Sequence, residues 1–143
     1  LNSRLWTWRE TPFVAIADGI HLGRYPDRET ALHFHDIMDL TAEFSACGKS
    51  PRRIAFPMLD LVAPDAVTLR KAARAIEALQ GQKPVLVCCA LGYGRSAMAI
   101  AVWLVLSGRA ASMEAAVAMV REKRPQIAIS PSQMQAIRGA VHG

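Results

Sequence analysis

Hydrophobic and polar positions along the chain form two kinds of segment, short apolar runs and longer stretches that carry an apolar stripe. In residues 66–79 the apolar positions recur every three or four residues, which predicts an amphipathic helix packed on a core. Residues 84–88 read Pro-Val-Leu-Val-Cys, a continuous apolar run that is typical of a strand buried on both faces. Because strands and helices alternate, we predict an α/β fold, a central, mostly parallel twisted sheet of four to five strands with helices on both sides.

The same pattern predicts the remaining elements. Strands are expected at residues 13–17, 20–22, 37–40 and 54–56, and Asp18-Gly19 forms the hairpin turn between the first two. Further helices are expected at residues 29–35, from about 97 to a stop at Gly108, from the Ser112 cap to 123, and from Pro131 onward. Ser130-Pro131-Ser132-Gln133 is typical of a capping box with proline at the first helical position.

Length and composition limit the classes of protein that need to be considered. The 143 residues predict one domain over residues 1–143, in which residues 1–12 form an N-terminal extension. The formal net charge of +5 suits anionic substrates, but the absence of a run of five basic residues argues against nucleic acid as a partner. Three cysteines without a disulfide framework favour a reducing, cytoplasmic location, and the four histidines show no metal-ligand spacing. We expect a monomer; that the chain is the cytosolic part of a longer, membrane-attached parent stays open.

The strongest chemical signal follows the strand at residues 84–88. Cys89-Ala-Leu-Gly-Tyr-Gly-Arg95-Ser96 forms a glycine-bearing turn that leads directly into an apolar helix. Such a turn points backbone N–H groups and the positive end of the helix at one spot, so it binds anions. Arg95 adds a forked guanidinium that matches two phosphate oxygens, and its position excludes the lysine that a nucleotide P-loop needs. We therefore interpret Cys89 as a thiolate nucleophile beside a phosphate cradle that is formed by Ala90, Leu91, Gly92, Tyr93, Gly94 and Arg95.

This stretch resembles the signature of the cysteine-based protein tyrosine phosphatase superfamily, which is Cys, five residues, Arg, then Ser or Thr. The chain length and the segment Asp-Gly-Ile-His-Leu-Gly-Arg-Tyr-Pro at residues 18–26 are similar to its dual-specificity branch. The resemblance implies a phosphatase that needs neither metal nor cofactor and forms a phosphocysteine on Cys89. It assigns substrate binding to Arg95 and stabilisation of the departing thiolate to Ser96. The chain departs from the family at Cys88, where a histidine usually precedes the nucleophile.

The mechanism also needs a general acid that protonates the leaving oxygen. In the dual-specificity branch this acid lies about thirty residues before the nucleophile, and Asp60 lies 29 residues before Cys89. Asp65 is the competing candidate, but Pro64-Asp65 opens a predicted helix, so we interpret Asp65 as its N-cap. We favour Asp60.

Several hypotheses on the substrate and on Cys88 stay open. The uncharged side chains of residues 90–93 favour phosphotyrosine or phosphoserine/threonine proteins over substrates with extra phosphates, while a phospholipid or small phosphomonoester is the alternative. The replaced histidine leaves room for a phosphate-binding pseudophosphatase. A redox bridge from Cys89 to Cys88 or to Cys47 is a third hypothesis. For Arg24 and Arg28 there are two interpretations, the rim of a phosphate pocket and solvated loop charges, and we favour the second.

Overall fold

The computed structural model describes residues 13–40, 52–55, 65–89 and 94–142. The predicted N-terminal extension, Cys47, Asp60 and loop residues 90–93 lie outside these ranges. The strands are β1 (Phe13–Ala17), β2 (Ile20–Arg24), β3 (Asp36–Asp39), β4 (Arg52–Ala55) and β5 (Val85–Cys89). The helices are α2 (Arg28–Ala31), α3 (Ala66–Leu79), α4 (Arg95–Leu106), α5 (Met113–Lys123) and α6 (Pro131–His142).

The five described strands form one sheet in the order β1-β2-β5-β3-β4. β5 pairs in parallel with β2 and with β3, and β3 pairs in parallel with β4. β1 pairs with β2 in an antiparallel hairpin whose turn residues Asp18 and Gly19 have φ angles of 48° and 83°. The predicted α/β fold with a mostly parallel sheet is confirmed. The carboxyl ends of β2, β3, β4 and β5 all lie at one edge of the sheet, which is where binding crevices form in such folds.

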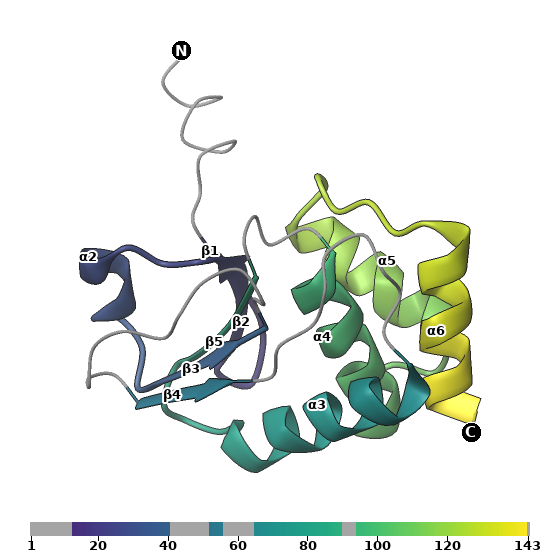
Figure 1. The fold of residues 1–143 in the computed structure, drawn as a ribbon, viewed down its shortest axis with the longest axis horizontal. Helices are drawn as coiled ribbons and strands as arrows, with labels where there is room; N and C mark the ends of the chain where they lie inside the picture. Colours follow the sequence, from purple (N-terminus) through teal and green to yellow (C-terminus); the bar gives the residue numbers. More distant parts are fainter. Residues whose placement is uncertain (1–12, 41–51, 56–64, 90–93, 143) are drawn as a thin grey trace.

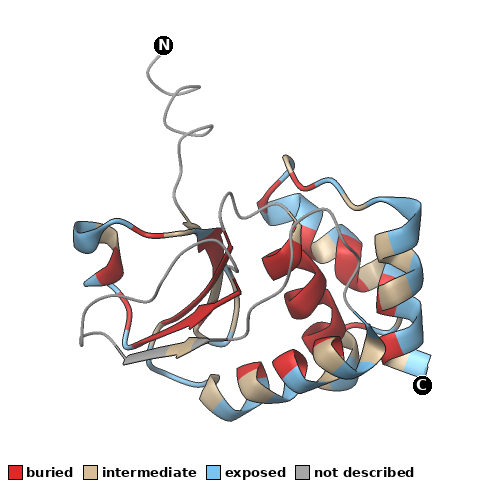
Figure 2. Ribbon diagram, in the orientation of Figure 1, coloured by how far each residue is buried: buried red, intermediate tan, exposed pale blue. Residues whose placement is uncertain are grey.

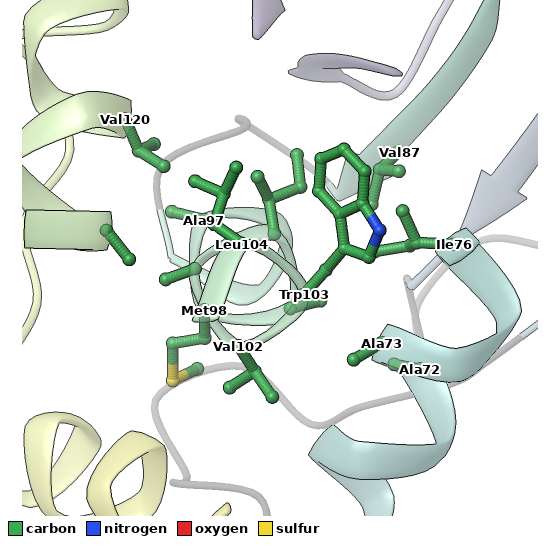
Figure 3. Packing of buried hydrophobic residues seen from close by; sticks show 14 of the residues in the cluster. Ala72, Ala73, Ile76, Val87, Ala97, Met98, Val102, Trp103, Leu104 and Val120 are labelled. Atoms are coloured by element: carbon green, nitrogen blue, oxygen red, sulfur yellow. The ribbon is translucent and has the colours of Figure 1, made fainter. Parts of the chain in front are cut away.

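Four helices, α3 to α6, cover one face of this sheet (Figure 1). α4 lies at their centre, and its first ten residues are all buried, as expected of a helix that is apolar on every side (Figure 2). Trp103 of α4 packs among Ile76 of α3 and Val87 of β5 (Figure 3), and its indole Nε1 donates a hydrogen bond of 2.8 Å to Oε1 of Glu77. The apolar helix predicted from about residue 97 is thus confirmed, and it forms the buried centre of the helical layer.

The opposite face of the sheet carries a smaller cluster of buried residues. Its members are Ala31, Phe34, Ile37, Leu86 and Cys88. In the described part of the chain, the one helix on this side is α2, a single turn that ends at Ala31 and not at residue 35 as predicted. The predicted helical cover on this side of the sheet is thus a single helical turn, α2. The segment that follows α2 contributes Phe34 to the cluster.

The predicted helix caps are confirmed in detail. Oδ1 of Asp65 accepts a hydrogen bond of 2.7 Å from the backbone N–H of Thr68 at the start of α3. At the start of α6, Oε1 of Gln133 accepts from the backbone N–H of Ser130 at 2.8 Å, and Ser130 Oγ accepts from the backbone N–H of Gln133 at 3.2 Å. This reciprocal pair is a capping box. Of the helices that the structure describes, none has both the length and the hydropathy to cross a bilayer.

Candidate active site

The predicted nucleophile and its predicted hydrogen-bond partner meet at the carboxyl edge of the sheet. Cys89 is the last residue of β5, and Ser96 is the second residue of α4. The Cys89 Sγ and the Ser96 Oγ lie 3.2 Å apart, and both residues are buried. A hydroxyl at this distance is able to donate a hydrogen bond to a thiolate. The contact that we predicted from the sequence is therefore present.

Arg95 and Gly94 form the end of the predicted phosphate cradle. Gly94 is the N-cap of α4 and Arg95 its first residue, so the helix begins two positions earlier than predicted. Glycine has no side chain, so no side chain of the N-cap residue occupies the free N–H groups at the start of α4. The positive end of the helix dipole lies at the same place. Arg95, the predicted phosphate ligand, is 3% exposed and follows Gly94 directly. The roles of Ala90, Leu91, Gly92 and Tyr93 stay predictions.

The two adjacent cysteines have different environments. Cys89 belongs to the main core on the helical face, and Cys88 belongs to the small cluster on the opposite face. Successive residues of a strand point to opposite faces, which explains the difference. Cys88 and Cys89 form no disulfide with each other. Because the sheet lies between their side chains, this geometry argues against a bridge between Cys88 and Cys89, whereas a bridge to Cys47 falls outside the described residues.

The residues beside Cys89 on the neighbouring strands complete this edge of the site. Arg24 of β2 is the register partner of Cys89. On the other side, the backbone N–H of Leu40 donates a hydrogen bond of 2.9 Å to the carbonyl of Cys88. The interpretation of Arg24 as a loop residue is wrong, since β2 extends two residues beyond the predicted Leu22. The signal was present in the sequence: Ile20, Leu22 and Arg24 follow the period of two that places them on one face of a strand.

Asp65 is not suited to serve as the general acid. Hydrogen bonds from the backbone N–H and then from the side chain of Thr68 hold the pKa of the Asp65 carboxyl below its usual value of 3.8. A general acid must carry its proton at the operating pH, so a carboxyl with a lowered pKa is a poor donor at neutrality. Its role as the N-cap of α3 explains why an aspartate is found at this position. Asp60 lies outside the described residues and stays the predicted acid.

Comparison with known proteins identifies the family of this chain. Residues 20–140 match the profile described as dual specificity phosphatase, catalytic domain. The chain belongs to this family. The match begins at the first residue of β2, includes the strand that bears Cys89, and ends within α6. The predicted recognition, the dual-specificity branch of the cysteine-based superfamily, is confirmed.

Solved structures of phosphatases share this dual specificity phosphatase fold. Tk-PTP in its active form superposes with a TM-score of 0.79 at 24% identity, over 92% of this chain and 97% of that one. PTPMT1 in complex with PI(5)P gives a TM-score of 0.77 at 20% identity, over 91% and 94%. Human DUSP28 gives 0.76 at 20% identity, over 90% and 92%. No curated protein sequence matches the chain significantly. The family and the fold support a phosphatase function.

Proposed function

We propose that this protein hydrolyses phosphomonoesters in two steps through a phosphocysteine intermediate on Cys89. The observation that carries the proposal is the 3.2 Å contact between the Cys89 Sγ and the Ser96 Oγ at the positive end of α4. A helix N-terminus favours the thiolate form of a cysteine and also favours bound phosphate. The contact occurs within a chain of the dual specificity phosphatase family, which supports this chemistry.

In the first step, the Cys89 thiolate attacks the phosphorus of the substrate. The new S–P bond forms as the P–O bond to the leaving group breaks, and Asp60 gives its proton to the leaving oxygen. The Arg95 guanidinium and the backbone N–H groups of residues 90–95 bind the three equatorial oxygens. Donors fixed in a buried site stabilise developing charge more effectively than water does. The products are an alcohol or phenol and the phosphocysteine.

In the second step, water replaces the sulfur. Asp60, now ionised, accepts a proton from the water as its oxygen attacks phosphorus. The S–P bond breaks, its electron pair returns to the Cys89 sulfur, and inorganic phosphate leaves. The Ser96 hydroxyl donates a hydrogen bond to this sulfur as negative charge returns to it, which stabilises the departing thiolate. The enzyme is restored without a metal or a redox cofactor.

We propose phosphotyrosine and phosphoserine/threonine proteins as the substrate class. The uncharged side chains of residues 90–93 offer no countercharge inside the cradle for additional phosphates. A second candidate is a phospholipid, because the solved structure of PTPMT1, similar in fold, contains PI(5)P. Rates on a phosphotyrosine peptide, a phosphothreonine peptide and PI(5)P, measured side by side with a chelator present, distinguish the two classes. A dominant rate on PI(5)P would overturn the protein-substrate assignment and leave the mechanism intact.

The adjacent cysteines provide a matched test of the mechanism. We expect Cys89→Ser to abolish turnover of p-nitrophenyl phosphate in the presence of EDTA. Cys88→Ala, which removes a thiol on the other face of the same strand, should keep turnover within a few-fold of wild type. Vanadate should inhibit the wild-type protein. A Cys89→Ser variant that retained a tenth of wild-type turnover would exclude the phosphocysteine step, and phosphate binding without any wild-type turnover would favour a pseudophosphatase.

A further inference from the structure

Arg24 and Cys89 are register partners on the neighbouring parallel strands β2 and β5. Two other pairs along these strands show which face of the sheet the Arg24 and Cys89 side chains occupy. Ile20 with Val85 and Leu22 with Val87 are pairs within the main core, on the helical side of the sheet. The register therefore puts Arg24 on the same face as the nucleophile. Neighbouring strands lie about 4.8 Å apart, so the two side chains leave the sheet next to each other.

Burial changes along this face of β2 in the direction of the site. Ile20 and Leu22 are both 0% exposed beneath the helices, whereas Arg24 is exposed. The helical layer thus covers this face of the strand up to Leu22 and leaves Arg24, its last residue, exposed. Arg24 is a second cation at the nucleophile, in addition to the buried Arg95, and the two-step mechanism assigns it no task.

The charges around Arg24 limit what it binds. Asp27 lies near enough for the Arg24 charge to contribute, after the hydrogen bonds from Thr30, to the lowered pKa of the Asp27 carboxyl. Arg28 and Glu29 follow, so this segment contains two positive and two negative side chains whose charges cancel. Anionic membranes attract polybasic segments. A nearly neutral segment with one cation, Arg24, on the strand next to Cys89 suits one anionic group on a peptide better than a membrane surface.

We infer that Arg24 is a specificity-determining residue that binds a second anionic group, an acidic side chain or a second phosphate, beside the phosphoresidue of a peptide substrate. The inference rests on the proposed function of the site. Alternate residues of an extended peptide lie on one side, about 6.5 to 7 Å apart. A guanidinium one strand away from the nucleophile is therefore matched to an anion two residues from the phosphoresidue. The forked donors of arginine bind carboxylate and phosphate in two-point fashion, which lysine does not.

The test compares paired phosphopeptides that differ at one position, with glutamate or alanine two residues before or after the phosphoresidue. For the wild-type protein we expect kcat/KM to be roughly 3- to 10-fold higher for the better glutamate peptide, a range set by exposed and charge-assisted pairs. The ratio should fall to about one in Arg24→Ala, take an intermediate value in Arg24→Lys, and keep its wild-type value in Arg28→Ala. Because each ratio is taken on one preparation, a partial loss of folded protein cancels. Added NaCl should reduce the wild-type ratio.

A binding measurement separates this inference from the proposed function. Cys89→Ser and the double variant Cys89→Ser/Arg24→Ala are titrated with the same labelled peptides, and we expect the preference for glutamate only in the former. If the wild-type protein turned over no phosphomonoester, the proposed function would fail, and these titrations would still decide the role of Arg24. A wild-type ratio near one, or a ratio that survives in Arg24→Ala, overturns the inference. A preference confined to bisphosphorylated inositol headgroups overturns its peptide assignment.

Discussion

The Ser96→Ala substitution tests the chemistry of the site most directly. The Ser96 side chain is 0% exposed, and its Oγ lies 3.2 Å from the Cys89 Sγ. Alanine removes the hydroxyl that donates a hydrogen bond to the thiolate. Because the position is buried, a water molecule is a poor replacement for this donor. A hydrogen bond to a charged group contributes about 1.5–3 kcal/mol. At 1.36 kcal/mol for each factor of ten, we expect a loss of roughly 10- to 160-fold in the step that forms the thiolate.

That step is the breakdown of the phosphocysteine. Negative charge returns to the Cys89 sulfur as the S–P bond breaks, whereas in the intermediate the sulfur is neutral and gains little from Ser96. The substitution therefore raises the barrier for hydrolysis of the intermediate, and phosphocysteine should accumulate. Stopped-flow measurement with p-nitrophenyl phosphate should show a burst of p-nitrophenol close to one equivalent of Ser96→Ala enzyme, followed by a slow steady state. Phosphate release should show no burst.

The same helix supplies the control. Ser107 caps the other end of α4, and its Oγ donates a hydrogen bond of 3.4 Å to the carbonyl of Leu104. Ser107→Ala removes the same atom from the same helix, far from Cys89, and should leave kcat and the burst at their wild-type values. If a folded Ser96→Ala protein kept the wild-type kcat and gave no burst, the hydroxyl would have no part in the departure of the thiolate.

Three further predictions concern the acid, the hairpin and the replaced histidine. Asp60→Asn should slow hydrolysis of alkyl phosphates by roughly 10²- to 10⁴-fold and flatten the pH profile, whereas Asp65→Ala should change kcat little. Because the Asp65 pKa lies below 3.8, its stabilisation is present above that pH and is lost as the pH falls through the lowered pKa, so Asp65→Ala should lower Tm more at pH 7 than at pH 2. Gly19→Ala should lower Tm more than Gly108→Ala: both have φ near +80°, but only the new Cβ at Gly19 would meet a backbone carbonyl oxygen, at 2.5 Å. Cys88→His should destabilise the fold by roughly 1–3 kcal/mol in thermal melts, because an imidazole overfills a position that is 0% exposed.

Much of the fold could be predicted because its signals are local. The period of the apolar stripe gave α3 its bounds, Ala66–Leu79, without error. Asp65 and Ser130 were predicted as caps because a side-chain acceptor next to a helical run satisfies the free N–H groups of the first turn. The contact between Cys89 and Ser96 could also be predicted from a local signal, because the two residues lie only seven positions apart in the sequence.

The errors fall at the ends of elements, where local signals conflict. The strand β2 reaches Arg24, as its alternation indicates, but an arginine directly before Tyr25-Pro26 is also typical of the start of a loop. The helix predicted over residues 29–35 stops at Ala31, because the chain then turns to bury Phe34 against the sheet. The pairing of Arg24 with Cys89 joins residues that are far apart in sequence, and it depends on β5 being inserted between β2 and β3. No sequence window contains that information.

The catalytic and the specificity residues are therefore held by different parts of the structure. Cys89 and Ser96 belong to β5 and the first turns of α4, whose residues are buried without exception over Val85–Cys89 and through the first ten positions of α4. Both residues are buried, and Cys89 belongs to the main hydrophobic cluster, so the burial that stabilises the domain also restrains their 3.2 Å contact. Arg24 stands at the exposed end of its strand, where a substitution costs little packing. With the roles proposed here, substrate preference would change at Arg24 while Cys89 and its hydrogen-bond partner Ser96 stay fixed.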